Sequence, residues 1–309
     1  MSLHEKVFRK AAKGGTEKAG RSAMHSVANT GPQLKRREFF ATSSEDTKGG
    51  QGFDPDDISG CMLWLKADAI TSHSDGDDLT AWSDSSGEGN DITVPGTAAR
   101  RPHYKTGIMN SQPAILFTGS ADEYLTTSGI NNITKGGVDF SVFLVVKPTS
   151  VSTNNQLMFG SYTTTNWQNT GASTASNKLA MGIDNASKFA VYGADIDSDK
   201  LIGTALSDDT AYVLSCVYDD SANIMWQFID GTQSDKETSY ESGTNSAAHP
   251  TMGAILTSGR GGTTYSNEYT GYIAEVVVFD SVLSERNLVD MHHYLGNKYG
   301  ISVPSKSRY

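Results

Sequence analysis

The sequence predicts an all-β protein, an antiparallel sandwich of two sheets followed by a short C-terminal helix. Three observations favour this fold class. Glycine is abundant, with 31 residues, and proline is scarce, with 8, a composition suited to many turns. Short apolar runs recur at strand-like spacing from Phe53 onward. Only one segment, close to the C-terminus, has apolar residues at helical spacing.

The predicted strands are short, apolar and rich in β-branched and aromatic residues. The run FSVFLVV at 140–146 is continuous and is followed by Pro148, as expected of a strand buried on both faces. Asp230-Gly231 closes a later run and predicts a hairpin turn. The full series comprises residues 63–65, 114–117, 140–146, 157–160, 188–193, 211–218, 224–231 and 272–279.

The single predicted helix follows the last strand. Ser284 is a suitable N-cap, and Gly300 is placed to end the helix. Between them, apolar or amphipathic side chains recur on one helical face, at Leu288, Met291, His292, Leu295 and Tyr299.

The charge distribution divides the chain into a basic arm, an acidic body and a polar tail, at residues 1–52, 53–303 and 304–309. Residues 1–50 hold ten of the 25 Lys and Arg residues and five of the 35 Asp and Glu residues, a balance of +5 that leaves −15 for the rest. The acidic body argues against nucleic acid as its partner. The arm is suited to anchoring on an acidic protein surface or nucleic acid, although a solvated tail has the same composition. Its anchoring candidates are Lys6, Arg9, Lys10, Lys35, Arg36 and Arg37.

The cysteines and the targeting signals indicate the cellular compartment in which the chain is made and folded. Cys61 and Cys216 lie in apolar strand-like runs, which predicts buried thiols and leaves a single bridge between them open. No run approaches 18 apolar residues, so we expect no membrane partner. The N-terminus is too polar for a secretion signal, and the Arg36-Arg37 pair lacks the apolar segment of an export signal. We therefore expect synthesis and folding in a cytoplasm.

Four stretches of sequence occur in a distinctive order. The first is LWLKADAIT at 63–71 with LTAWSDSSGEGNDIT at 79–93, and the second is PAILFTGSADEYL at 113–125. The third is FSVFLVVKPTS at 140–150 with the paired strands of 212–233, and the fourth spans 271–301. Together they resemble the concanavalin A-like lectin/glucanase superfamily, in its laminin G-like branch. The resemblance implies a jelly-roll sandwich for residues 53–303.

The resemblance leaves function open, because the superfamily includes sugar-binding modules, adhesion domains, glycoside hydrolases and parts of virus particles. Its glucanases place their carboxylates in a Glu-x-Asp-x-x-Glu strand. Here no Glu is followed two positions later by Asp, and Glu275 stands alone among valines. Serine-elbow, phosphate-loop and dinucleotide-binding motifs are also missing, and the His292-His293 pair lacks ligands one helical turn away. We expect a non-enzymatic protein.

Two polar loops are candidates for binding a glycan or a protein partner. Sugar recognition uses aromatic platforms with nearby amide or carboxylate groups. Residues 161–177 contribute Tyr162, Trp167, Gln168 and Asn169, and residues 259–271 contribute Tyr265 and Tyr269. A subunit interface or cover for the sandwich edge would use the same aromatic residues.

Calcium is a further candidate ligand, because clustered loop oxygens suit a hard cation. Asp195, Asp197 and Asp199 form a D-x-D-x-D run that begins like a calcium loop. Lys200 replaces the glycine of such a loop, and Leu206 replaces its bidentate glutamate. Exposed turn aspartates are the alternative, so no cofactor is required and calcium remains possible.

The combined sequence features favour a structural or attachment protein. A surface-recognition body without an export signal suits a bacteriophage virion, whose proteins fold in the host cytoplasm. We expect a capsid decoration or tail-fibre component, held by its arm to other virion proteins or to copies of itself, with the sandwich facing protein or host glycan. A soluble lectin, with or without a requirement for calcium, is the first alternative, and a glycoside hydrolase is the second.

Overall fold

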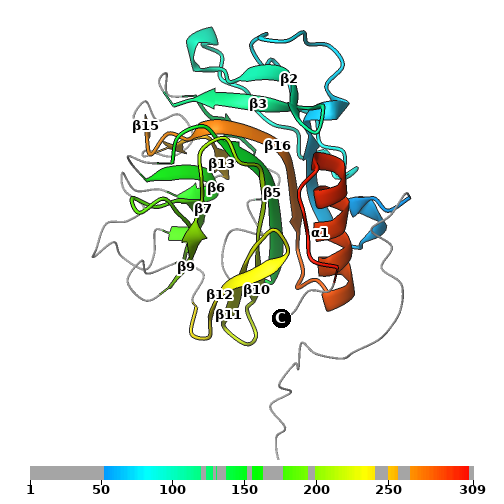
Figure 1. The fold of residues 1–309 in the computed structure, drawn as a ribbon, viewed down its shortest axis with the longest axis vertical. Coiled ribbons are helices and arrows are strands. Elements are labelled where there is room, and N and C mark those ends of the chain that lie inside the picture. The colour runs from blue at the N-terminus through cyan, green and yellow to red at the C-terminus, as the bar shows by residue number, and fades with distance from the viewer. Residues whose placement is uncertain are drawn as a thin grey trace, which may run out of the picture. The chain divides into compact units, whose positions relative to one another are not determined.

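The computed structural model describes residues 52–119, 123–127, 130, 137–151, 155–162, 177–193, 199–240, 250–256 and 265–305. Two antiparallel sheets pack face to face, and one helix lies on the outer face of the larger sheet, as Figure 1 shows. The predicted fold class is therefore confirmed. The anchoring residues of the arm and the tail from residue 306 lie outside the described residues, so the arm stays a prediction.

The larger sheet has eight strands, with seven in the order β12-β11-β10-β5-β16-β3-β2. Strand β16 lies at its centre and pairs with β5 along one side. Its other side pairs with β3 over the first half and with β1 over the second half. The strands are β1 (Cys61–Lys66), β2 (His103–Met109), β3 (Gln112–Thr118), β5 (Phe140–Pro148), β10 (Tyr212–Asp219), β11 (Ile224–Ile229), β12 (Thr232–Glu237) and β16 (Thr270–Phe279).

The smaller sheet has six strands in the order β4-β13-β6-β7-β8-β9. They are β4 (Leu125–Thr126), β6 (Gln156–Tyr162), β7 (Asn177–Ile183), β8 (Lys188–Tyr192), β9 (Lys200–Ala205) and β13 (Thr251–Met252). A separate pair is formed by β14 (Ile255–Leu256) and β15 (Tyr265–Ser266). The described residues also form three short 3-10 helices: η2 (Pro55–Asp57) before β1, and η3 (Ala67–Ala69) and η4 (Ala98–Arg100) between β1 and β2.

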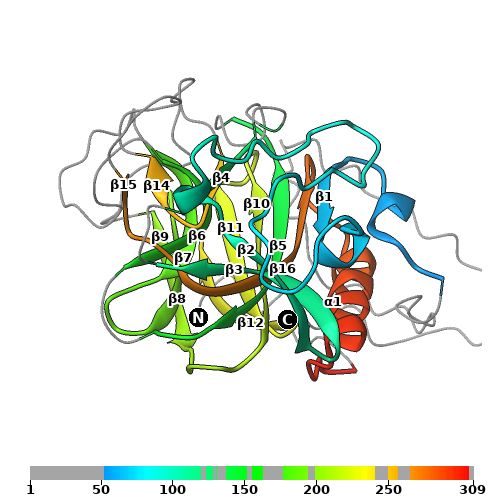
Figure 2. The same cartoon turned by 90° about the horizontal axis from the view of Figure 1, so that it is seen from above.

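Alternation along β5 shows how the larger sheet serves two cores. Val142 and Leu144 face the core between the sheets, whereas Phe143 and Val145 face the core beneath the helix. Both sets are fully buried, which confirms the prediction of a strand buried on both faces. The sandwich therefore has three layers, a small sheet, a large sheet and a helix, and Figure 2 shows the same elements from above.

Helix α1 (Glu285–Tyr299) has the predicted ends. The Ser284 hydroxyl accepts a hydrogen bond from the Asn287 amide at 3.2 Å. Gly300 adopts the left-handed conformation with φ of 70°, which ends the helix. Leu288, Met291 and Leu295 pack on the outer face of the larger sheet. Among the residues with described structure, no helix is both long and apolar enough to span a membrane.

The two cysteines lie in different cores. Cys216 belongs to the core between the sheets, and Cys61 to the core beneath the helix. Both thiols are free and buried, so the bridge left open by the sequence does not form. Burial raises the pKa of both thiols, to about 12 for Cys61, so they are poor nucleophiles at neutral pH.

Candidate binding pocket

The structure places the two predicted aromatic loops at separate positions along β6. Tyr162 ends this strand and pairs with Asn177 across the hairpin to β7. At the other end of β6, the Leu157 amide donates to the Asn267 carbonyl at 2.8 Å. Five residues of strand separate these points, a distance of about 17 Å. The bases of the two loops therefore do not form one site.

Most of the predicted contact residues of these loops cannot be placed. Trp167, Gln168 and Asn169 lie outside the described residues, as do the side chains of Tyr162 and Tyr265. Their role in glycan or partner contact therefore stays a prediction.

Tyr269 is a core residue, so its assignment to an exposed sugar platform is wrong. Its side chain is fully buried, and its ring packs against Phe117 with the ring centres 6.2 Å apart. The hydroxyl donates to the Tyr272 carbonyl at 3.2 Å, and burial raises its pKa well above the usual value. Tyr269 and Ile273 both belong to the core between the sheets, which is the even spacing of one strand face. The polar neighbours of Tyr269 conceal this alternation in the sequence.

Of the three aspartates in the proposed calcium run, only Asp199 lies within the described residues. Asp199 is buried, and its backbone carbonyl accepts from the Gly193 amide at 2.7 Å. Asp195 and Asp197 lie outside the described residues. Within the described ranges, no group of three or more His, Cys, Asp or Glu side chains is arranged to hold a metal ion. Asp199 is therefore not an exposed turn aspartate, and the calcium site stays a prediction.

The Asp84 carboxylate organises the glycine-rich segment that follows Trp82. Its Oδ1 accepts from the backbone amides of Trp64 and Ser86, each at 2.9 Å. Its Oδ2 accepts from the Ser86 hydroxyl at 2.7 Å and from the Asn90 amide at 2.9 Å. Four donors leave this carboxylate little capacity for a ligand, so the segment is a structural turn that is tied to β1.

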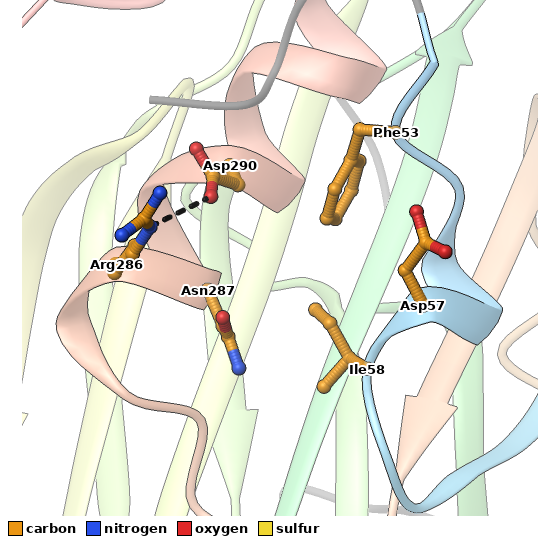
Figure 3. A pocket seen from close by; sticks show the side chains of 6 residues that line it. All are labelled: Phe53, Asp57, Ile58, Arg286, Asn287 and Asp290. Carbon is orange, nitrogen blue, oxygen red and sulfur yellow. Dashed lines mark ion pairs between the residues drawn. The ribbon is translucent and has the colours of Figure 1, made fainter. Parts of the chain in front are cut away.

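A pocket of about 240 Å³ opens between η2 and the first turns of α1, as Figure 3 shows. Two apolar and four polar side chains line it: Phe53, Asp57, Ile58, Arg286, Asn287 and Asp290. Phe53 and Ile58 are anchored in the core beneath the helix. The helix places Arg286 and Asp290 one turn apart on its side toward this pocket. Aromatic, aliphatic, amide, carboxylate and guanidinium groups thus meet at one place.

Asp290 is the most unusual group of this pocket. Its side chain is only 3% exposed, yet its Oδ1 has no hydrogen-bond partner within the described structure. Its Oδ2 lies 3.8 Å from Arg286 Nε, which is an ion pair but too long for a hydrogen bond. A buried carboxylate with unused acceptor capacity is costly, because burial removes its water without replacing it.

The floor of the pocket is held by a buried polar network. The Phe53 ring meets the Tyr294 ring edge to face, with centres 5.9 Å apart. Tyr294 donates from its hydroxyl to Glu275 Oε1 at 3.0 Å, and Trp64 Nε1 donates to the same oxygen at 2.6 Å. Lys298 and Tyr299 each donate to Oε2 at 2.8 Å. Glu275 is fully paired and fixes the helix on the sheet, which makes the Phe53 wall rigid.

A serine–histidine pair lies deeper under the helix. Ser215 Oγ is 2.8 Å from His292 Nε2, and both residues are fully buried. Burial lowers the pKa of His292 to about 3, so the ring is neutral at physiological pH. Without exposed surface the pair cannot meet a substrate in this conformation, and it serves as a polar contact between α1 and β10. Ser215 carries no sequence signal for this role.

The sequence does not single out the pocket residues either. The four-residue spacing of Arg286 and Asp290 predicts an ion pair within one helix. Their position opposite η2 depends on the packing of segments more than 220 residues apart, which no local pattern encodes.

The chain matches no protein-family model and no curated protein. Among solved structures, the binding domain of Paraclostridial Mosquitocidal Protein 1 aligns with 76% of this chain and 51% of its own, at 8% identity and a TM-score of 0.50. Domain 4 of AbnA, a GH43 extracellular arabinanase from Geobacillus stearothermophilus in complex with arabinotriose, aligns with 75% of this chain and 98% of its own. Its identity is 16% and its TM-score 0.47. The botulinum neurotoxin serotype D binding domain aligns with 76% of this chain and 51% of its own, at 14% identity and a TM-score of 0.48.

At these identities, the likeness to the mosquitocidal protein's binding domain concerns the fold alone. It is compatible with the lectin-like jelly-roll sandwich that the sequence predicts, without assigning a family. This chain spans about half the length of the aligned mosquitocidal and botulinum chains.

Proposed function

We propose that this chain is a non-enzymatic recognition module whose β-sandwich binds carbohydrate. The observation that carries the proposal is the pocket between η2 and α1, where Asp290, Asn287 and Arg286 converge beside Phe53. Sugar hydroxyls both donate and accept hydrogen bonds, so they need acceptors and donors at the same place. A carboxylate supplies acceptors, a guanidinium supplies donors, and an amide supplies both. The aromatic ring offers an apolar surface to the C–H groups of a sugar.

Several features favour binding over glycoside hydrolysis. Hydrolysis uses two carboxyl groups, one as general acid and one as nucleophile or base, on either side of the bond. In the pocket, Asp290 is paired with Arg286, and Asp57 Oδ2 accepts from the Asp54 amide at 3.1 Å. Glu275 is enclosed by four donors. We therefore propose that the module does not catalyse hydrolysis.

The loop between β6 and β7 is a second element of the proposal. The two strands form a rigid frame that ends in the pair Tyr162 and Asn177. Loops of such length on a rigid scaffold commonly carry function. We therefore retain Trp167, with Gln168 and Asn169, as a second contact for a longer glycan.

A glycan array probed with the full-length chain tests this function, in parallel with and without calcium. We expect reproducible binding to a restricted set of glycans. Binding in both conditions would favour the pocket and the aromatic loop, whereas strict calcium dependence would favour the aspartates of the 195–199 run. The absence of any glycan signal in either condition would refute carbohydrate recognition.

Anchoring in a virion is a second proposed role, and it concerns the arm. It is supported by the charge division of +5 in residues 1–50 against −15 in the rest. Among described residues, Val138 is the one large hydrophobic side chain that is exposed, so this part of the sandwich offers no apolar docking face. We propose that the arm attaches the chain to a bacteriophage particle, as a capsid decoration or fibre component.

Co-sedimentation with the particle tests the anchoring role. We expect a variant with Lys35, Arg36 and Arg37 changed to glutamate to leave the particle fraction, whereas changes of Lys188 and Lys200 on the sandwich should not matter. Undiminished incorporation of the arm variant would contradict anchoring through these residues.

A further inference from the structure

The two sheets meet along one side of the sandwich, where β9 lies beside β12. Within the described structure, each of these strands is the last of its sheet. The outer side of such a strand carries backbone groups that can pair with a strand of another molecule. We infer that the Asp235 carboxylate closes this side of the sandwich and keeps β12 from pairing with β12 of a second copy of this chain. Asp235 lies outside the pocket that carries the proposed carbohydrate binding.

Asp235 binds one backbone amide from each sheet. Its Oδ2 accepts from the Ile202 amide of β9 at 2.7 Å, and its Oδ1 accepts from the Lys236 amide of β12 at 2.8 Å. Hydrogen bonds to an ionised acceptor are roughly twice as strong as those between neutral groups. The carboxylate therefore occupies one donor on each of the two facing edges and holds the edges together.

A buried amide supports the same closure from the interior. Gln227 of β11 is fully buried, and its Nε2 donates to the Phe189 carbonyl of β8 at 3.1 Å. The Ser234 hydroxyl donates to Gln227 Oε1 at 2.9 Å. Gly203 of β9 leaves the space for this approach, because a Cβ atom there would lie 2.8 Å from Gln227 Oε1. Gln227 thus joins the sheets inside the sandwich, whereas Asp235 joins them at its surface.

The residues of β12 favour a second copy of the chain as the partner. The strand is at least partly exposed along its whole length, and it carries Asp235, Lys236 and Glu237 in succession. Asp235→Ala would leave one positive and one negative charge at neighbouring positions. In an antiparallel pair of identical strands, each Lys236 can lie opposite the Glu237 of the other copy, and such cross-strand charge pairs are stabilising. Two-fold symmetric pairing would also satisfy free backbone groups on both edges.

The test measures the mass of the full-length chain by light scattering after size-exclusion chromatography, over a range of concentrations. We expect Asp235→Ala to raise the weight-average mass about twofold relative to the wild type, since two identical edges form a closed pair. A folded Asp235→Ala variant with the mass of the wild type would overturn the inference. Asp235→Thr, which favours a strand but is too short to reach β9, replaces it if thermal melting shows that the alanine variant is unfolded. The same rise is expected, and an unchanged mass would overturn the inference equally.

Asp208→Ala is the matched control. Its carboxylate also accepts from a backbone amide, that of Val151 at 2.7 Å, but it lies between β9 and β10, outside both sheets. We expect this variant to keep the mass of the wild type. An equal rise in mass would attribute association to the loss of any such contact, and the inference would fall.

A proline variant identifies the strand edge through which the molecules meet. The Lys236 amide loses its carboxylate acceptor in Asp235→Ala, and proline at this position removes that donor from the edge. We expect Asp235→Ala combined with Lys236→Pro to return to the mass of the wild type. Continued association of the double variant would show that the molecules do not pair through β12, which refutes the inference.

Discussion

Asp230 shows how a turn residue can limit stability at neutral pH. It has a positive φ of 50°, and its Oδ1 accepts from the Val213 amide at 2.8 Å. Burial raises its pKa to about 6, above its ordinary value of 3.8. The folded state therefore holds the proton more tightly than the unfolded chain does, and ionisation costs stability as pH rises through 6.

We expect Asp230→Asn to stabilise the protein at pH 7 by about 2 kcal/mol. Asparagine retains an acceptor for Val213, tolerates the left-handed conformation and carries no charge. Near pH 3, below both pKa values, the aspartate is largely protonated in both states, so the advantage should disappear. Urea unfolding at pH 7 and pH 3 measures the difference. The same advantage at both pH values would contradict the assignment to ionisation.

His292 has the opposite dependence on pH. Burial lowers its pKa in the folded state to about 3, while the unfolded chain takes up the proton near pH 6.5. Stability from this residue is complete above pH 6.5 and is lost as pH falls toward 3, by about 1.4 kcal/mol per pH unit. We expect His292→Gln, which can still hydrogen-bond Ser215, to flatten the acid limb of stability. Unfolding free energies between pH 7 and 4.5 test it, and His293→Gln is the neighbouring control.

At the scale of elements, helix α1 depends on its cap. The Ser284 hydroxyl satisfies the Asn287 amide, which otherwise has no partner inside the helix. We expect Ser284→Ala to lower the free energy of unfolding by about 1 kcal/mol. Glu285→Gln, which removes a charge from the same first turn, should cost only about 0.3 to 0.5 kcal/mol. Equal losses would show that charge, rather than the cap, supports this helix end.

Elements with a strong local signal were predictable. The β5 strand is mostly apolar, and α1 has both caps and a clear apolar face, so local residues determine them. Strand β12 (Thr232–Glu237) reads TQSDKE and has no apolar alternation, so the sequence does not reveal it. It forms because the turn at Asp230-Gly231 returns the chain onto β11. Strands β2, β7 and β9 are likewise not predicted from the sequence, because their pairing depends on neighbouring strands.

The candidate pocket was less predictable than the fold for the same reason. Its walls come from the two ends of the body, Phe53 to Ile58 and Arg286 to Asp290, and the packing of the third layer brings them together. Aromatic residues in polar loops were a weaker guide, because Tyr269 is held inside the sandwich by long-range strand pairing. Residue type indicates the chemistry that is available, and only tertiary packing decides which groups meet.

At the scale of the whole molecule, Glu275 connects the third layer to the larger sheet. It belongs to β16, and its donors come from β1 and α1. Three elements from opposite ends of the body therefore share one carboxylate, which is fully buried. Removing one partner of such a buried charged network leaves the others unpaired, and this loss is far larger than that of an exposed ion pair.

We expect Glu275→Gln to lower the free energy of unfolding by about 3 kcal/mol, because the Lys298 ammonium loses its buried counter-charge. Asp68, 2.9 Å from Lys298, supplies the remaining charge partner. The loss should appear in one cooperative transition, seen alike by tryptophan fluorescence and far-ultraviolet circular dichroism, since the network joins the layers.

Lys105→Ala, which breaks an exposed pair with Asp75, is the control and should barely move the midpoint. Two separate transitions in the Glu275 variant would mean that α1 melts from the sheet by itself. The Phe53 wall of the pocket would then depend on this carboxylate, and glycan binding should weaken with the first transition.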